Sequence, residues 1–202
     1  MNTYFEKFFL ANPYDLLNPD DYPSDLHGWN DHESHFTRLA PDAKLVIEVG
    51  AWKGRGTLAL ARSCPNATIV AIDTWLGAKE MWLNKADPER YGALRLKNGI
   101  PQLAFEFLAN MMRGGVHDRV MPLPLPSNIA LGMCLELNLK PDLVYIDASH
   151  EYEDVKSDII KTLALEPGVI CGDDYQPGWP GVVQVVDELI PDANKAGHFW
   201  WI

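Results

Sequence analysis

The stretch from Lys44 to Thr57 reads KLVIEVGAWKGRGT, and it decides the expected fold. Its first six residues form a largely apolar run, typical of a β-strand that is buried on both faces. Glycines follow at positions 50, 54 and 56, where they permit a tight turn and let a ligand approach the backbone. A helix is expected to open at residues 56–63, and its first N–H groups can bind a ligand. A strand, a glycine turn and a helix in this order indicate an α/β protein with a ligand at the turn.

Strands and helices are predicted to alternate along the rest of the chain. Strands are expected at residues 44–49, 68–72, 119–125, 142–146 and 168–171, with a closing strand at 197–202. Helices are expected at residues 27–40, 56–63, 102–112, 128–137, 152–163 and 182–189. The alternation predicts a Rossmann-like, doubly wound, mostly parallel α/β sheet with helices on both faces and an antiparallel or inserted strand at its C-terminal edge. Between residues 189 and 202 we expect little room for a pair of strands.

The 202 residues are expected to form one domain, residues 1–202, with enough chain to bury a sizeable core. Residues 1–40 are interpreted as an N-terminal cap segment. Residues 76–99 lengthen one connection beyond a simple crossover, so they are a candidate lid or substrate insertion. A surface excursion without a role is the alternative. Because the chain is short, we leave open a homo-oligomer in which a partner closes the site.

The composition excludes some partners. The net charge is −11 and the pI about 4.9, so nucleic acid and anionic membranes are not expected to bind, and a small-molecule partner is favoured. Three scattered cysteines without a CxxC pair indicate neither a disulfide framework nor a zinc site. The N-terminal residues lack a secretion signal, and no window approaches a membrane span. A cytoplasmic location is the expectation.

Two cofactors are compatible with the glycine turn. Residues 54–59, GRGTLA, satisfy the dinucleotide pattern GxGxxA, which would suit a nicotinamide-dependent oxidoreductase. In that fold, however, the first glycine directly follows the strand, and here this glycine is Gly50. Glu48, just before the turn, is unfavourable beside a pyrophosphate and suits a ligand with an amino group or a sulfonium. Asp73 ends the second strand, where its carboxylate can accept hydrogen bonds from ribose hydroxyls.

From Glu48 to Thr57, and at Asp73, the sequence resembles the class I S-adenosylmethionine-dependent methyltransferases. The resemblance covers roughly residues 44–174 and implies S-adenosyl-L-methionine as the cofactor. The cofactor-binding residues are predicted to be Glu48, Gly50, Ala51, Trp52, Gly54, Gly56, Thr57, Asp73, Thr74, Trp75 and Ser127.

Two further apolar runs end in acids, DLVYID at residues 142–147 and GVICGDD at residues 168–174. If these strands are neighbours, Asp147, Asp173 and Asp174 converge on one edge of the sheet. Three uncompensated carboxylates would repel one another, and some would take up protons. A divalent cation would remove this conflict, and oxygen ligands favour magnesium, manganese or calcium. We therefore predict that these three residues bind a metal ion, with magnesium as the first choice.

The acidic residues also carry a closer resemblance. The spacing Asp147-x-x-His150-x-Tyr152, followed by an acidic pair, is similar to the macrocin-type sugar O-methyltransferases. It is also related to the catechol-type enzymes and to cephalosporin hydroxylase-like sequences. The catechol-type relatives place a lysine base where this chain has His150. A histidine can accept a hydroxyl proton at neutral pH; the alternative is a helix-capping or surface histidine.

Other histidines are given structural roles. His27, His32 and His35 are interpreted as surface and cap residues, because no metal-ligating partners flank them in the sequence. His27 and Trp29 are additional candidates for a lid over the cofactor.

The predicted function is therefore an S-adenosylmethionine-dependent, divalent-metal-assisted O-methyltransferase. Its acceptor would be a hydroxyl of a small molecule: a vicinal diol, a sugar or a catechol-like compound. His150 and Asp147 are the predicted catalytic residues. Three alternatives stay open: a metal-free methyltransferase, a nicotinamide-binding oxidoreductase, and a non-catalytic cofactor-binding protein of the same fold.

Overall fold

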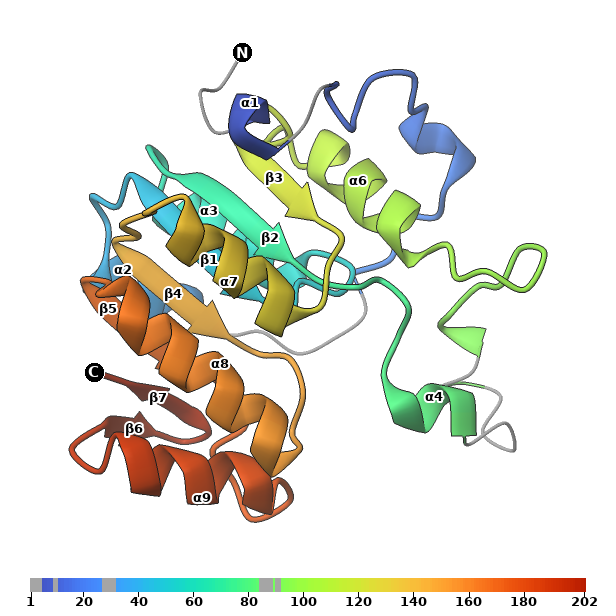
Figure 1. The fold of residues 1–202 in the computed structure, drawn as a ribbon. Helices are drawn as coiled ribbons and strands as arrows, with labels where there is room; N and C mark the ends of the chain where they lie inside the picture. Colours follow the sequence, from blue (N-terminus) through green and yellow to red (C-terminus); the bar gives the residue numbers. More distant parts are fainter. Residues whose placement is uncertain (1–4, 9–10, 27–31, 84–88, 90–91) are drawn as a thin grey trace.

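The computed structural model describes residues 5–8, 11–26, 32–83, 89 and 92–202. Within these residues seven strands form one sheet in the order β3-β2-β1-β4-β5-β7-β6 (Figure 1). The first five strands are parallel to one another, and β7 and β6 are antiparallel. The strands are β1 (Leu45–Val49), β2 (Thr68–Ile72), β3 (Val120–Leu123), β4 (Leu143–Ile146), β5 (Val169–Gly172), β6 (Asn194–Ala196) and β7 (Phe199–Trp201). This order confirms the predicted doubly wound sheet with an antiparallel C-terminal edge.

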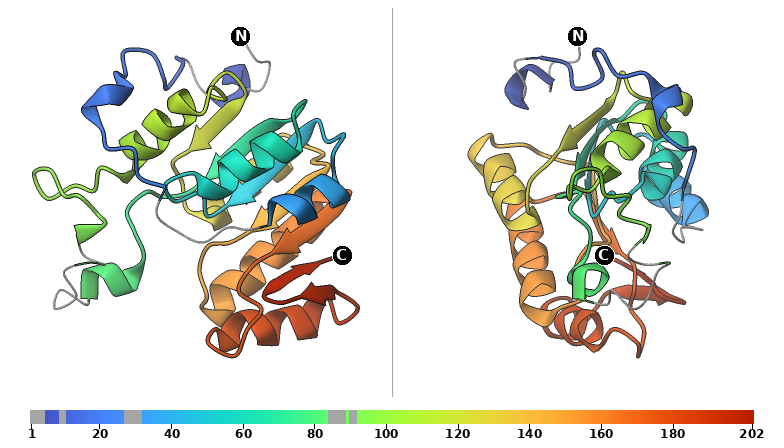
Figure 2. Two further views of the ribbon diagram at one scale, coloured as in Figure 1. Left: turned by 180° about the vertical axis from the view of Figure 1, so that it is seen from behind. Right: turned by 90° about the vertical axis from the view of Figure 1, so that its right-hand side faces the viewer.

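Helices cover both faces of the sheet (Figure 2, right). α7 and α8 lie on one face, with α9 packed beside α8, and α2, α3 and α6 lie on the other face. Their bounds are α2 (Glu33–Leu39), α3 (Arg55–Ser63), α6 (Leu103–Arg113), α7 (Ser127–Glu136), α8 (Tyr152–Leu165) and α9 (Pro180–Leu189). Every residue of β1, β2, β3 and β4 is buried. Two covered faces therefore explain why these strands are continuous apolar runs rather than alternating ones.

The register of the central strands brings their carboxyl ends together. Val49 of β1 pairs with Ile146 of β4, and Ile146 pairs with Gly172 of β5. The residues that follow these strands therefore share one edge of the sheet, which is where open α/β sheets bind ligands.

At the C-terminal edge, the closing strand predicted at residues 197–202 is present as β7, but the expectation of little room for a strand pair is wrong. A pair of strands does fit after residue 189: β6 and β7 form a hairpin whose turn contains Gly197 with a φ of 62°. It fits because each strand has only three residues. Trp200 of β7 is buried and pairs with Gly172 of β5, so the hairpin completes the core.

The N-terminal segment and the insertion add short elements. They are α1 (Phe5–Phe8), the 3-10 helix η1 (Pro19–Asp21) and α4 (Lys79–Leu83). η1 packs against α6, whereas α4 extends away from the sheet (Figure 1). The helix predicted for residues 27–40 begins at Glu33, and residues 27–31 lie outside the described part. None of the described helices is long and apolar enough to cross a membrane.

Candidate functional site

The glycine loop between β1 and α3 is held close to the end of β4. Gly50 has a φ of 97°, which favours glycine. A Cβ added to it would lie 1.9 Å from the carbonyl oxygen of Asp147. The Gly50 N–H donates to the carbonyl of Ile72, at 2.8 Å. The loop therefore depends on glycine for its conformation and for its contact with the neighbouring strand end.

Glu48 is an ionisable residue inside β1, and only 1% of its surface is exposed. Its Oε2 accepts a hydrogen bond from the Thr57 hydroxyl. Burial raises the pKa of Glu48 to about 8; the Thr57 hydrogen bond opposes this rise, and the negative charges of Asp147 and Asp73 add to it. Among the described residues, the charged neighbours that act on Glu48 are carboxylates, so a positively charged ligand would stabilise its ionised form.

Asp73 follows β2 and holds the glycine loop in place. One carboxylate oxygen accepts the backbone N–H of Trp52 at 2.8 Å, and the other accepts that of Trp75 at 2.7 Å. Burial raises the pKa of Asp73, and hydrogen bonds from backbone N–H groups oppose this rise. The Trp75 side chain is buried, and its indole N–H donates to the Trp52 carbonyl at 2.6 Å. Trp75 therefore supports the loop from the core.

A cavity of about 890 Å³ extends along this edge of the sheet. The predicted cofactor residues that line it are Glu48, Gly50, Ala51, Trp52, Gly56, Asp73, Thr74 and Ser127. All four residues predicted for catalysis or metal binding line it too: Asp147, His150, Asp173 and Asp174. Gly54, Thr57 and Trp75 do not line it, so their contribution to a ligand site is indirect. The cavity thus brings the two groups of predicted residues into one space.

The acidic residues after β4 and β5 are neighbours, as the sequence predicted. The Asp147 N–H donates to the Val49 carbonyl at 2.8 Å, and the Asp173 N–H donates to the Ile146 carbonyl at 3.1 Å. Burial, together with the negative charges of Asp173 and Asp174, raises the pKa of Asp147 to about 7. The Tyr145 hydroxyl, buried beneath, donates to Asp147 Oδ2 at 2.9 Å. Asp147 can therefore exchange a proton near neutral pH.

Asp173 pairs with a histidine that the sequence did not suggest. His32 Nε2 lies 2.9 Å from Asp173 Oδ2, and His198 Nδ1 lies 3.8 Å from Asp173 Oδ1. Burial alone would raise the pKa of Asp173, but His32, the Asp174 N–H and His198 outweigh it, so its pKa is below the ordinary value. The interpretation of His32 as a surface residue is wrong, because it is only 5% exposed. It occupies the N-cap position of α2, yet its side chain makes no capping hydrogen bond.

The remaining histidine interpretations have mixed outcomes. His35 is partly buried and stacks on Phe199, with ring centroids 4.5 Å apart. His27 and Trp29 lie outside the described residues, so their role as a lid stays a prediction.

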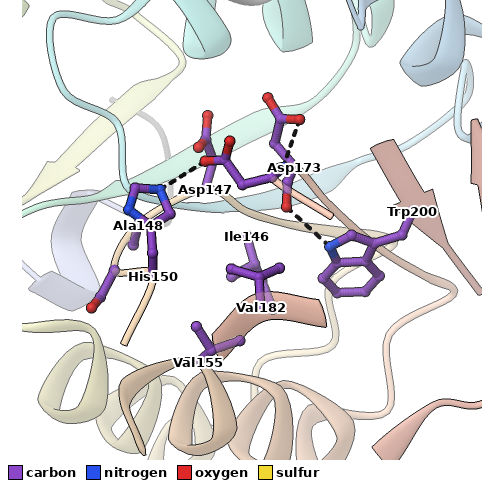
Figure 3. A pocket seen from close by; sticks show the side chains of 10 residues that line it. Ile146, Asp147, Ala148, His150, Val155, Asp173, Val182 and Trp200 are labelled. Carbon is purple, nitrogen blue, oxygen red and sulfur yellow. Dashed lines mark hydrogen bonds and ion pairs between the residues drawn. The ribbon is translucent and has the colours of Figure 1, made fainter. Parts of the chain in front are cut away.

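His150 is held by two contacts from the segment after β5. Its Nε2 lies 2.7 Å from Asp174 Oδ2, and its ring stacks on Trp179, with centroids 3.8 Å apart and planes at 17°. Figure 3 shows its ring turned toward the carboxylates, above a small pocket whose apolar floor includes Ile146, Val155 and Val182. A histidine fixed in this way at a cavity wall is suited to proton transfer.

The carboxylates do not form a metal centre as they stand. Among the described residues, no group of three His, Cys, Asp or Glu side chains is placed to hold a metal ion. Tyr145, His32 and His150 each bind one of the three carboxylates. A cation could bind here only if these contacts were released, so the metal site stays a prediction, and we assign no catalytic step to a metal.

Several cavity residues were missed in the sequence. They are Arg55, Lys79, Met81, Ser149, Glu151, Asp154, Ser157, Asp158 and Trp179. The surroundings of Trp179, in PGWP at residues 177–180, carried a signal, because proline and glycine near a strand end indicate a loop at the ligand edge. The polar residues of α8 carried no such signal, since a solvated helix face has the same composition.

The glycine register disfavours a dinucleotide site. Gly54 is the N-cap of α3 and the helix begins at Arg55, so most of GRGTLA lies inside the helix. The first glycine of that pattern would have to follow the strand directly. Gly50 holds that position instead.

Comparisons with known proteins agree with this fold. The chain resembles the cofactor-bound protein Rv0187 from MTB (TM-score 0.63, 19% identity, 91% of this chain and 84% of the other covered). It also resembles an O-methyltransferase from Bacillus cereus in complex with SAH (TM-score 0.58, 17% identity, 88% of this chain and 83% of the other covered). A third similar structure is that of the O-methyltransferase TomG from Streptomyces achromogenes, which is involved in tomaymycin synthesis, in complex with SAM (TM-score 0.57, 18% identity, 90% of this chain and 82% of the other covered).

These identities are low, so the three likenesses establish the fold. No curated protein matches the sequence. Residues 47–175 match the family described as "Methyltransferase domain". The match spans the glycine loop, Asp73 and the acidic strand ends, which is more than half of the sequence, and the chain therefore belongs to this methyltransferase family.

Proposed function

We propose that the protein transfers the methyl group of S-adenosylmethionine to a hydroxyl oxygen of a small molecule. The observation that carries the proposal is the continuous cavity of about 890 Å³ between the glycine loop and His150. A volume of this size suits ligands of cofactor and metabolite size. The similar folds of O-methyltransferases from Bacillus cereus and Streptomyces achromogenes support oxygen as the acceptor atom.

The residues around the glycine loop fit this cofactor. Gly50 lets a ligand approach the backbone without a side chain in the way. Glu48 offers a buried carboxylate to a positively charged group, and Asp73 offers carboxylate oxygens to ribose hydroxyls. When bound, S-adenosylmethionine would supply an electrophilic methyl group on a positively charged sulfur.

Proton removal from the acceptor is assigned to His150. Asp174 and Trp179 fix its ring, so it can accept the hydroxyl proton in a defined orientation. Asp147, whose pKa of about 7 allows it to change protonation near neutral pH, is the second group that can exchange a proton with the acceptor. The surrounding acidic residues disfavour an acceptor that carries phosphate or carboxylate groups.

The vicinal diol, sugar or catechol-like acceptor and the divalent cation belong to the same proposal. Support for the cation comes from the raised pKa of Asp147, to which burial contributes most and the negative charges of Asp173 and Asp174 add. Binding a cation would require Asp173 and Asp174 to leave their histidine partners.

Calorimetry with S-adenosylhomocysteine, with and without magnesium, tests the cofactor and the cation separately. Turnover is then measured with S-adenosylmethionine and a panel of catechols, sugar diols and their monohydroxyl analogues. We expect His150→Ala to lower turnover about 10²- to 10⁴-fold and to leave the affinity for S-adenosylhomocysteine unchanged. His35→Ala, outside the cavity lining, is the matched control and should keep the wild-type rate.

Three results would contradict the proposal. Binding of NAD instead of S-adenosylhomocysteine would indicate the oxidoreductase. Cofactor binding without turnover on any acceptor would indicate a binding protein. Equal loss of turnover and cofactor affinity in His150→Ala would contradict the role assigned to His150.

A further inference from the structure

A network of four charged side chains lies at the glycine loop, and none of the four lines the cavity. Lys53 Nζ is 2.6 Å from Asp25 Oδ2 and 3.1 Å from Glu106 Oε2. Arg95 Nε is 3.0 Å from Glu106 Oε1, and Arg95 Nη2 is 3.4 Å from Asp25 Oδ2. The Lys53 side chain is 1% exposed and that of Glu106 is 0% exposed. Two positive and two negative charges therefore compensate one another around the buried pair of Lys53 and Glu106.

Each member of the network comes from a different segment. Lys53 belongs to the glycine loop and Glu106 to α6. Asp25 belongs to the N-terminal segment that follows η1, and Arg95 to the insertion between β2 and α6. The network therefore joins the loop that lines the cavity to both segments that the sequence suggested as covers.

Further hydrogen bonds to backbone carbonyls strengthen the same junction. The Asn110 side-chain amide donates to the backbone carbonyls of Asp25 and Lys53, at 2.8 and 2.9 Å. Arg55, the first residue of α3, donates from Nε to the Leu26 carbonyl at 2.7 Å. The N-terminal segment is thus fixed to the glycine loop at residues 25 and 26, as well as to α6.

The glycine loop transmits this attachment to the cavity. Trp52 lines the cavity, has a positive φ of 46°, and donates its N–H to Asp73. Lys53 follows it directly, but its side chain points to Asp25 and Glu106 rather than into the cavity. Because neighbouring residues in a tight turn cannot move independently, contacts that fix Lys53 also restrict Trp52 and its bond to Asp73.

A buried ion pair is seldom retained for stability alone, because its desolvation offsets most of the attraction. An apolar side chain of similar length could fill the space of Lys53 against α6. Only a charged group also binds Asp25 and Glu106 with defined directions. The network therefore specifies which segments meet at the loop.

We propose that Lys53 is a positioning residue of the cofactor site, through which docking of the N-terminal segment and of the insertion is coupled to cofactor binding. The inference rests on the proposed cofactor, S-adenosylmethionine. Coupling of this kind is reciprocal: docked segments raise cofactor affinity, and a bound cofactor stabilises the docked segments by the same factor.

Hydrogen exchange with and without S-adenosylhomocysteine tests the coupling. Residues 19–26 do not line the cavity, so protection of their amides by the ligand reports coupling rather than contact. We expect clear protection in the wild type. In Asp25→Asn, which leaves the buried Lys53 in place, we expect loss of that protection and about tenfold weaker binding. Asp25→Glu should restore both.

Asp21→Asn is the matched control. Asp21 is an exposed carboxylate of η1 in the same segment, and its side chain bonds to Asn18 rather than to the glycine loop. It should behave as the wild type. If Asp25→Asn does not fold, Arg95→Gln tests the insertion in the same way, because Arg95 is 44% exposed. In the wild type the ligand should also protect the amides of residues 93–100, which do not line the cavity. This protection should be lost in Arg95→Gln.

The outcomes separate this inference from the proposed function. No binding of S-adenosylhomocysteine by the wild type would overturn both. Binding without protection of residues 19–26, or with wild-type affinity in Asp25→Asn, would overturn the coupling alone.

Discussion

Replacing Glu48 by Gln should stabilise the ligand-free protein at alkaline pH, although the residue lies in the proposed cofactor site. The pKa of Glu48 is raised by burial to about 8, against an ordinary value of 4.5. Between these two values the unfolded chain has lost the proton and the folded protein still holds it. The free energy of unfolding therefore falls as pH rises from 4.5 and levels off above 8. Glutamine cannot titrate, so the variant lacks this loss.

The size of the effect follows from the same values. Each pH unit between the unfolded and folded pKa corresponds to about 1.4 kcal/mol, so ionisation of Glu48 withdraws about 5 kcal/mol of stability once the pH exceeds 8. Near pH 5 the stabilities of the two proteins should differ by less than about 1 kcal/mol. At pH 8.5 the variant should unfold roughly 10 to 20 °C higher, at 2 to 4 °C per kcal/mol for a chain of this length.

Urea unfolding at pH 5.5, 7.0 and 8.5 measures the difference directly, with Glu153→Gln on the exposed side of α8 as the control. The control should follow the wild-type curve at every pH. In the same samples, Glu48→Gln should bind S-adenosylhomocysteine about ten- to a hundredfold more weakly, because a hydrogen bond to a charged group is lost. Parallel stability curves for wild type and Glu48→Gln would refute the burial argument.

Two further predictions concern packing around the site. Gly50→Ala should lower the free energy of unfolding by more than about 4 kcal/mol and abolish cofactor binding, because the alanine Cβ would lie 1.9 Å from the Asp147 carbonyl oxygen. Gly99→Ala has a similar positive φ but open space around the Cβ, so it should cost only about 1 to 2 kcal/mol; equal losses in thermal unfolding would contradict the steric reason. Trp200→Ala should lower the free energy of unfolding by about 3 to 5 kcal/mol, because the indole is buried and donates to the Asp173 carbonyl at 3.2 Å. Urea unfolding measures this change, and a loss below about 1 kcal/mol would exclude the packing role.

The sheet and the position of the site could be predicted because both depend on local patterns. Continuous apolar runs occur where a strand is covered on both faces, and β1, β2, β3 and β4 are such strands. The residue after each run then lies at the ligand-binding edge. Asp73, Asp147 and Asp173 each follow such a run, and all three line the cavity at that edge.

The partners of these residues could not be predicted, because they come from distant segments. Nothing near His32 in the sequence indicates that it reaches Asp173. Lys53 and Glu106 are of types that are usually solvated, and only the fold shows that they compensate one another in the interior. The strand β6 was missed for another reason, since a strand of three residues is too short to show a periodic pattern.

The buried carboxylates at the carboxyl ends of the strands lower the stability of the ligand-free protein and also favour ligand binding. Burial raises the pKa of Glu48, Asp73 and Asp147, so in the ligand-free protein these carboxylates ionise only at a cost in stability. Asp173 differs, because His32 lowers its pKa. The charge compensation supplied by the chain is therefore uneven: it is present at Asp173, weak at Asp147 and absent at Glu48, where the described neighbours add negative charge. A ligand with positive charge near Glu48 would supply the missing compensation, so the same burial that destabilises the empty site favours the binding of a sulfonium or amino group.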